Sequence, residues 1–258
     1  MSDEAALLQA VAEVAKVAGD VALRWFGTGV AEERKADGSP VTIADRSAEE
    51  AARAWIGARF PADEILGEEF GATGSGARRR WIIDPIDGTK SFVAGVPLWG
   101  TLIAVAEGED VLAGAINCAA AGELIAAARG QGAWHNGTRC RVSTQAALSE
   151  ATVLTTDDRF PGRPERASAW NTLANQARII RTWGDCFGYL LVATGRADVM
   201  VDDRMNPWDS ACLMPIIEEA GGVLTDWRGS RTAFGGDTVA TNLALSNTVR
   251  GILCARDR

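Results

Sequence analysis

Two aspartates stand three residues apart where an apolar segment runs into a glycine turn. The segment is "WIIDPIDGTKSF", residues 81–92, and the two acids are Asp84 and Asp87. A carboxylate at the end of an apolar strand loses hydration, which is costly unless a positive group meets it. We therefore expect a positively charged partner at this turn.

Further acids stand where the secondary structure is expected to change. They are Asp45 after "PVTIA", Glu68 and Glu69 at the end of "EILGEE", and Asp209 after a tryptophan at a helix start. Acids at strand ends and helix starts can converge on one cleft, where they repel one another unless cations bind them. Ligand sets made only of oxygen select hard ions such as Mg²⁺, Mn²⁺ or Ca²⁺, and Mg²⁺ usually recruits a phosphate. The pattern therefore favours metal-assisted phosphoryl chemistry, with phosphate oxygens on the N–H groups of the Gly88-Thr89 turn.

Each acid also has a purely structural interpretation. Asp45 and Asp209 could cap the helices that follow them, because Asp is a favoured N-cap residue. Glu68 and Glu69 could be solvated acids at a strand end, and "DPIDGT" could be an ordinary Asp-Gly turn. Spacing alone does not establish that these acids converge.

The composition excludes several other chemistries. The chain has one histidine, His135, beside an Asn-Gly pair that predicts a hairpin turn, so zinc hydrolases and Ser-His-Asp enzymes lack their imidazole. A net charge of −8 argues against nucleic acid or an anionic membrane as the main partner. No apolar run could span a bilayer, and the first residues carry acids rather than a basic signal region. The five cysteines are scattered, which is typical of free thiols, so we expect a cytoplasmic protein.

The segments around these motifs predict two lobes. Residues 4–26 have apolar positions at helical spacing, and a second helix is expected over about 45–60. Residues 99–142 form a predicted meander of strands, and from residue 151 strands and helices alternate as in α/β units. We expect an N-terminal α+β lobe over 1–145 with the metal motifs and an antiparallel sheet. A C-terminal α/β lobe over 146–258 would carry residues on the substrate side.

Four motifs in order resemble the signatures of one family. "SPVTIAD", "GEE", "WIIDPIDGTKSF" and "NPWDSACLMPIIEEAGG" are similar to those of the inositol monophosphatase family of Mg²⁺-dependent, lithium-sensitive phosphatases. The resemblance includes the "GxGAWxNG" hairpin at 130–137 and "LVATGRADV" at 191–199, so it covers nearly the whole chain. It implies a layered α-β-α-β-α sandwich of the inositol monophosphatase and fructose-1,6-bisphosphatase type. It also implies a small-molecule phosphate monoester as substrate and a homodimer.

The resemblance assigns a role to each motif residue. One Mg²⁺ would bind Glu68, Asp84 and the Ile86 carbonyl, a second would bind Asp84, Asp87 and Asp209, and a weaker third would bind Glu68 with waters. Mn²⁺ could substitute for these two or three ions. In the catalytic set of Asp45, Thr89 and Glu68, the first two would position and deprotonate the attacking water. Backbone amides of Gly88 and Thr89 would bind the phosphate, and the second ion would stabilise the leaving alkoxide, so no general-acid side chain is needed.

Residues outside the motifs decide which phosphate ester fits. "DGTKSFVAGVPLWGTLIAV" and "RTWGDCFGYLLVATGRADVMVD" resemble the histidinol-phosphate phosphatase branch. There an acid, here Asp185, stands where the inositol branch usually has a small neutral residue. A substrate with an ammonium and an imidazole suits acids and aromatic rings, so Asp185, Asp202 and Trp99 are candidate contacts. Their structural alternatives are helix capping, a solvated turn acid and core packing, respectively.

The sequence therefore favours a histidinol-phosphatase of histidine biosynthesis, which hydrolyses histidinol phosphate by in-line attack of a water activated by metal. The alternative is an inositol-1-phosphate or broad-specificity sugar monophosphatase. The branch acting on 3′-phosphoadenosine 5′-phosphate shares the lysine after "DGT" but typically continues with "EF", where this chain has Ser91 and Phe92. A non-catalytic metal-binding relative is disfavoured because the acids and Thr89 are all present.

Overall fold

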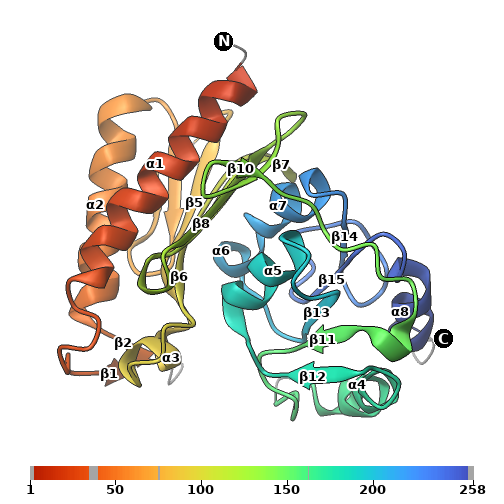
Figure 1. Cartoon of the computed structure of the whole chain (residues 1–258). Coiled ribbons are helices and arrows are strands. Elements are labelled where there is room, and N and C mark those ends of the chain that lie inside the picture. Colours follow the sequence, from red (N-terminus) through yellow and green to blue (C-terminus); the bar gives the residue numbers. More distant parts are fainter. Residues whose placement is uncertain (1–2, 35–39, 75, 162, 255–258) are drawn as a thin grey trace.

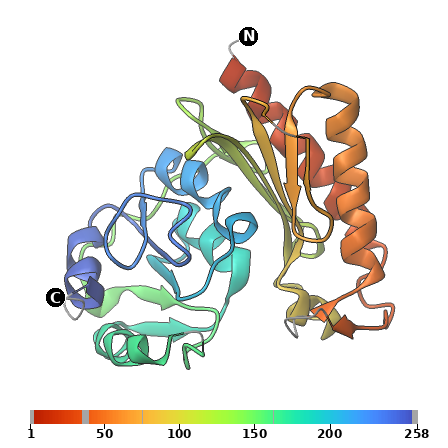
Figure 2. The same ribbon diagram turned by 180° about the vertical axis from the view of Figure 1, so that it is seen from behind.

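Helix α1 (Asp3–Leu23) turns a continuous apolar face toward a sheet, as the spacing of its residues predicts. The structure, a computed structural model, describes residues 3–34, 40–74, 76–161 and 163–254. Helix α2 (Ile43–Arg59) packs beside α1, and Figures 1 and 2 show both on the same face of the N-terminal sheet. Burial of one Val or Leu side chain contributes about 1.5–3 kcal/mol. Leu7, Val11 and Val14 are fully buried and hold α1 in place.

The N-terminal sheet has eight strands in the order β10-β9-β8-β7-β6-β5-β3-β4. Its strands are β3 (Glu64–Gly67), β4 (Gly71–Thr73), β5 (Arg80–Asp87), β6 (Gly100–Glu107), β7 (Asp110–Cys118), β8 (Glu123–Ala128), β9 (Gly132–His135) and β10 (Thr138–Arg139). Strands β6 to β10 form an antiparallel meander, which confirms the expectation for residues 99–142. Within this sheet, as far as the structure describes it, β3 and β5 are the one pair that runs parallel.

The pairing of β5 with β6 shifts at the aspartates of the opening motif. Asp84 lies opposite Leu102 and Asp87 opposite Gly100, so three steps along β5 match two along β6. In a regular strand, residues three apart point to opposite faces of the sheet. An extra residue in one strand, a β-bulge, restores a common direction. The bulge therefore allows both aspartates to face the same site.

The second sheet has five strands in the order β12-β11-β13-β15-β14. They are β11 (Thr152–Leu154), β12 (Ile179–Arg181), β13 (Val199–Asp202), β14 (Val223–Thr225) and β15 (Thr238–Thr241). The first three are parallel, as the alternation of strands and helices predicts, and β15 pairs antiparallel with β13 and β14. The chain passes from one sheet to the other between Arg139 and Thr152, and the division into lobes at 145/146 stays a proposal.

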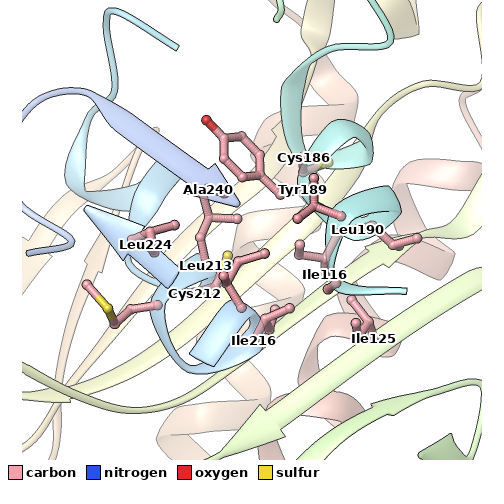
Figure 3. Packing of buried hydrophobic residues seen from close by; sticks show 14 of the residues in the cluster. Ile116, Ile125, Cys186, Tyr189, Leu190, Cys212, Leu213, Ile216, Leu224 and Ala240 are labelled. Atoms are coloured by element: carbon pink, nitrogen blue, oxygen red, sulfur yellow. The ribbon is translucent and has the colours of Figure 1, made fainter. Parts of the chain in front are cut away.

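Helices fill the space between the two sheets and cover the outer face of the second. The middle layer contains α5 (Asp185–Ala193), α6 (Pro207–Ser210) and α7 (Leu213–Glu219), and the outer layer contains α4 (Ala167–Ala174) and α8 (Ser246–Leu253). Figure 3 shows side chains of the first sheet, such as Ile116, meeting Leu190 and Ile216 of the middle layer. One core thus joins both halves, and the expected α-β-α-β-α sandwich is confirmed (Figure 1).

The other elements are short. They are β1 (Glu33–Arg34) paired with β2 (Pro40–Val41), α3 (Thr89–Val93), and the 3₁₀ turns η1 (Ala119–Ala121), η2 (Leu148–Glu150) and η3 (Pro164–Arg166). No helix among the described residues has the length and apolar content to cross a membrane.

Candidate active site

Asp84, Asp87 and Asp209 come together at the end of β5. Each offers a carboxylate oxygen, and these three oxygens lie within 4.8 Å of one another. The bulge in β5 supplies two of the acids, and the middle layer supplies the third through α6, which packs on β5. Asp209 is far from the other two acids in the sequence, and the layered fold makes the three neighbours.

Asp45 and Asp209 occupy the same local position in two helices. Each is the third helical residue of a capping box, behind the N-cap residues Thr42 and Asn206. Oδ2 of Asp45 accepts a hydrogen bond from the Thr42 backbone at 2.7 Å, and Oδ2 of Asp209 accepts one from the Asn206 backbone at 2.7 Å. The interpretation of both acids as N-cap residues is therefore wrong, because each acid lies three residues after the N-cap. The capping box fixes one oxygen of each acid and leaves the other free to face the site.

Glu68 reaches the cluster through strand pairing. Gly67 lies opposite Ile83 in the parallel β3–β5 ladder, and the Glu68 N–H continues it with a 3.1 Å bond to the Ile83 carbonyl. The next residue of β5 is Asp84, so the two acids stand side by side. Burial raises the pKa of both Asp84 and Asp45, and the charge of Glu68 adds to both shifts. Glu68 thus belongs to the same electrostatic site as the three aspartates.

The acids destabilise one another's charged forms. Burial raises the pKa of Asp84 well above its usual range, and the charges of Glu68 and Asp87 raise it further. Burial raises the pKa of Asp87 in the same way, followed by the charge of Asp185. Burial also raises the pKa of Asp209 to about 6, although the Asn206 N–H acts in the opposite direction. A divalent cation would relieve this repulsion, as the positive partner expected from the sequence would.

The donor set fits a hard cation. Its members are carboxylates and a backbone carbonyl, the oxygen ligands that Mg²⁺ and Mn²⁺ prefer. Oδ1 of Asp45 is buried and has no hydrogen-bond partner among the described residues, which leaves it open to a further polar group.

The glycine turn follows directly after these acids. Gly88 has φ +85°, and a Cβ at this position would lie 2.9 Å from the Leu98 carbonyl and 3.1 Å from Oδ2 of Asp185. Glycine is therefore required here, both for the left-handed conformation and for the space. The Thr89 hydroxyl donates a 3.0 Å hydrogen bond to the Ile86 carbonyl. Thr89 thus lies beside the carbonyl that the resemblance assigns to a metal ion.

A cavity of about 360 Å³ opens beside this turn. It is lined by Gly88, Thr89, Lys90, Ser91, Leu98, Thr156, Asp157, Arg159, Thr182, Gly184 and Asp185. The walls carry two acids and two bases, and Asp157 and Arg159 pair with each other at 2.6 Å. Asp185 is the acid on the α5 side of this cavity, opposite the turn that carries Gly88 and Thr89.

Asp185 starts α5 in an uncommon backbone conformation. Its φ is +51°, in the left-handed region that few residues other than glycine adopt. The Thr156 hydroxyl accepts a 2.8 Å hydrogen bond from the Asp185 N–H, and Oδ2 of Asp87 accepts one of 2.5 Å from the next N–H, that of Cys186. One helix start therefore links the wall of the cavity to a member of the acid cluster.

Two of the expected substrate contacts lie elsewhere. Trp99 is 0% exposed and packs against Phe26 and Phe92 in the core beneath the turn. Asp202 is 6% exposed, and its carboxylate accepts hydrogen bonds from the Tyr189 hydroxyl and the Thr156 backbone. Neither residue lines the cavity. Both lie behind the cavity wall. Trp99 packs under the Gly88-Thr89 turn, and Asp202 fixes the Thr156 segment by its hydrogen bond.

Sequence reasoning missed Thr156 and Thr182 as cavity residues. Both follow strands of the second sheet, β11 and β12, whose carboxyl ends meet at one edge because the strands are parallel. "TTDD" at the end of the apolar segment "ATVL" carries the same kind of signal as the other strand-end acids.

Comparisons with known proteins place these motifs in context. The model of the "Inositol monophosphatase family" matches residues 3–256. A "Histidinol-phosphatase" of Chlorobaculum parvum is 45% identical over 244 residues, which are 94% of each chain, and one of Mycobacterium tuberculosis is 38% identical over 84% of this chain and 85% of its own. The solved structure of an inositol monophosphatase from Zymomonas mobilis superposes with a TM-score of 0.87 at 31% identity, over 98% of this chain and 99% of the other.

Proposed function

The chain belongs to the inositol monophosphatase family, and from this premise we propose that it is a Mg²⁺-dependent histidinol-phosphatase. Family membership makes it a phosphate monoester hydrolase, and the identity of the ester is the proposal. The observation that carries it is Asp185, an acid held in the wall of the cavity beside the phosphate-binding turn. Two relatives that match most of the chain are named histidinol-phosphatase, which supports the same substrate.

The metal ligands of this proposal are five groups around the bulge. They are the carboxylates of Glu68, Asp84, Asp87 and Asp209 and the carbonyl of Ile86. We propose that they hold two or three Mg²⁺ ions and that Mn²⁺ can replace them. When bound, the ions supply positive charge to the phosphoryl and leaving oxygens and acidify water.

The chain itself positions the reactants. Oδ1 of Asp45 is buried, has no partner in the part of the chain that the structure describes, and can accept a proton from the attacking water. The Thr89 hydroxyl donates its hydrogen bond to the Ile86 carbonyl, so its oxygen can accept a hydrogen bond from the same water. The N–H groups of Gly88 and Thr89, at the start of α3, can bind phosphate oxygens.

Asp185 would select the part of the substrate that distinguishes histidinol phosphate. Burial and, next, the charge of Asp202 raise its pKa to about 7, although Lys90 acts in the opposite direction. A substrate ammonium close to this carboxylate would favour its charged form and form a charge-assisted hydrogen bond. Inositol and sugar phosphates offer neutral hydroxyl groups instead, so they would form a weaker hydrogen bond with a buried acid.

A phosphate-release panel in the presence of Mg²⁺ tests the proposal. We expect kcat/KM for histidinol phosphate to exceed that for inositol 1-phosphate and fructose 1,6-bisphosphate by at least about tenfold, because a charged hydrogen bond is worth about 1.5–3 kcal/mol. Comparable turnover of inositol 1-phosphate would instead support a broad-specificity monophosphatase. Full activity in EDTA would contradict the metal assignment.

We further propose that the protein is a cytoplasmic homodimer. All five cysteines are free thiols, which a reducing compartment preserves. Strand β12 is an edge of its sheet. Ile180 within it is 38% exposed and Trp183 just after it is 41% exposed, so a second copy could cover them. Light scattering on the purified protein would distinguish a dimer from a monomer.

A further inference from the structure

One face of helix α2 carries three charged residues at intervals of four, namely Asp45, Glu49 and Arg53. Residues four apart lie above one another on a helix. Asp45 belongs to the site already described, but neither of the other two does. Glu49 is 0% exposed, and a fully buried glutamate is unusual unless its charge has a specific task.

The Glu49 carboxylate binds the turn that follows Glu68. Its Oε2 accepts a 2.7 Å hydrogen bond from the Glu69 N–H, and its Oε1 accepts a 3.2 Å bond from the Phe70 N–H. These are the two peptide groups directly after Glu68. Together with the 3.1 Å bond from the Glu68 N–H to the Ile83 carbonyl, they fix the backbone on both sides of the Glu68 side chain.

Arg53 completes the attachment of this turn. Its Nε donates to Oε1 of Glu49 at 2.7 Å, and Nη1 donates to the Thr73 hydroxyl at 3.0 Å. A further nitrogen, Nη2, donates to the Gly71 carbonyl. The guanidinium therefore joins α2 to strand β4 and neutralises the buried carboxylate.

The residue before Glu68 has to be small for the Glu49 carboxylate to approach. A Cβ on Gly67 would lie 1.9 Å from Oε1 of Glu49, closer than any real contact. Gly67 does not have a left-handed backbone, so space alone explains the glycine. Burying a charged pair is weak evidence for stability, since well-packed apolar residues often serve as well. The placement of these hydrogen bonds suggests a different task.

We propose that Glu49 is a positioning residue that presents Glu68 to the metal site, with Arg53 holding Glu49 and Gly67 providing the space. The inference rests on the proposed function only in taking Glu68 as a metal ligand. Groups that orient ligands contribute about 10–100-fold to metal affinity. Loss of the Glu49 carboxylate should therefore weaken metal binding without removing any ligand.

Mn²⁺ titration without substrate, followed by electron paramagnetic resonance, tests the proposal. Glu49→Gln keeps the shape, but the amide nitrogen cannot accept a hydrogen bond from a backbone N–H. We expect a 10–100-fold higher Kd for Mn²⁺, a matching rise in the Mg²⁺ concentration at half-maximal activity, and kcat within about threefold of wild type at saturating Mg²⁺. The matched control is Glu50→Gln, the same change at the exposed neighbouring position, which should bind Mn²⁺ like wild type.

A folded Glu49→Gln protein with wild-type Mn²⁺ affinity would overturn the proposal, and so would a kcat loss that saturating Mg²⁺ does not restore. If Glu49→Gln does not fold, Arg53→Lys replaces it, because lysine keeps the charge and loses the fork of donors. That variant should weaken Mn²⁺ binding in the same direction, and unchanged binding would again contradict the role. Failure of the wild-type protein to bind Mn²⁺ would count against the proposed function instead.

Discussion

Asp185 has a left-handed backbone at the wall of the cavity, where most residues would be strained. Two hydrogen bonds maintain this conformation, one from its own N–H to Thr156 and one from the Cys186 N–H to Asp87. Strained residues at such positions are often functional, because the surrounding structure has to maintain them. The carboxylate also approaches Gly88, where a Cβ would lie 3.1 Å from its Oδ2. In the proposed function, the residue for substrate recognition and one of the metal ligands would therefore be joined by one short piece of backbone.

Asp185→Asn tests substrate recognition at this residue. Asparagine tolerates the left-handed conformation, so the fold should persist while the negative charge is lost. We expect kcat/KM for histidinol phosphate to fall by about 10–100-fold and that for p-nitrophenyl phosphate to fall by less than about threefold. Asp158→Asn, an exposed neighbour outside the cavity lining, is the control. Equal losses on both esters would remove Asp185 from substrate selection.

At the scale of elements, close contact between layers positions the third aspartate. A Cβ on Gly114 of β7 would lie 2.4 Å from the carbonyl oxygen of Cys212, which joins α6 to α7. Asp209 stands on α6, three residues earlier. The first sheet and the middle layer touch backbone to backbone at this glycine, so the distance between Asp209 and the β5 acids depends on it.

Gly114→Ala should therefore affect both stability and metal binding. Overpacking typically costs about 1–3 kcal/mol, and here it would push α6 away from β5. We expect a lower free energy of unfolding in urea and a higher Mg²⁺ concentration at half-maximal activity. Gly57→Ala is the matched control, since this exposed helix glycine has open space around it and alanine should stabilise by about 0.5–1 kcal/mol. Unchanged stability and Mg²⁺ response in Gly114→Ala would contradict the close contact.

The elements were largely predictable from the sequence, but the geometry within them was not. Helical spacing predicts α1, and glycine-separated strands predict the meander, because these patterns are local. The bulge at Asp84 and Asp87 depends on the partner strand β6, which periodicity cannot show. From the sequence, Trp99 could face either the cavity or the core. In the structure it packs against Phe92 in the core. Glu49 was missed because its role depends on a turn twenty residues away.

At the scale of the whole molecule, the site lies where the two halves meet. The first sheet contributes Glu68, Asp84 and Asp87, whereas Asp209 and Asp185 stand on helices of the middle layer. Burial raises the pKa of Asp84, Asp87, Asp185 and Asp209, because a buried carboxylate is costly in its charged form. Without a metal ion, only protons can neutralise these carboxylates, and they do so only at low pH. The folded protein should therefore respond to pH and metal together.

Stability without metal should fall as the pH rises. The pKa of Asp209 is raised to about 6 and that of Asp185 to about 7, both from 3.8, so the folded state binds protons that the unfolded state has released. The free energy of unfolding then decreases between about pH 4 and pH 7. We expect the Tm in EDTA to be lower at pH 8 than at pH 5, and Mg²⁺ to raise it more at pH 8. A Tm in EDTA that is independent of pH would contradict this electrostatic account.

Mg²⁺-dependent phosphate release by the Asp84→Asn variant tests whether the acid cluster is the metal centre of the enzyme. Asp84 is the acid that the two main metal positions would share, and asparagine keeps its size while removing its charge. With histidinol phosphate and saturating Mg²⁺, we expect kcat to fall by at least about 1,000-fold while the circular dichroism spectrum of the wild-type fold is retained. Turnover by a folded Asp84→Asn protein within about tenfold of wild type would show that the acid cluster is not the metal centre of this enzyme.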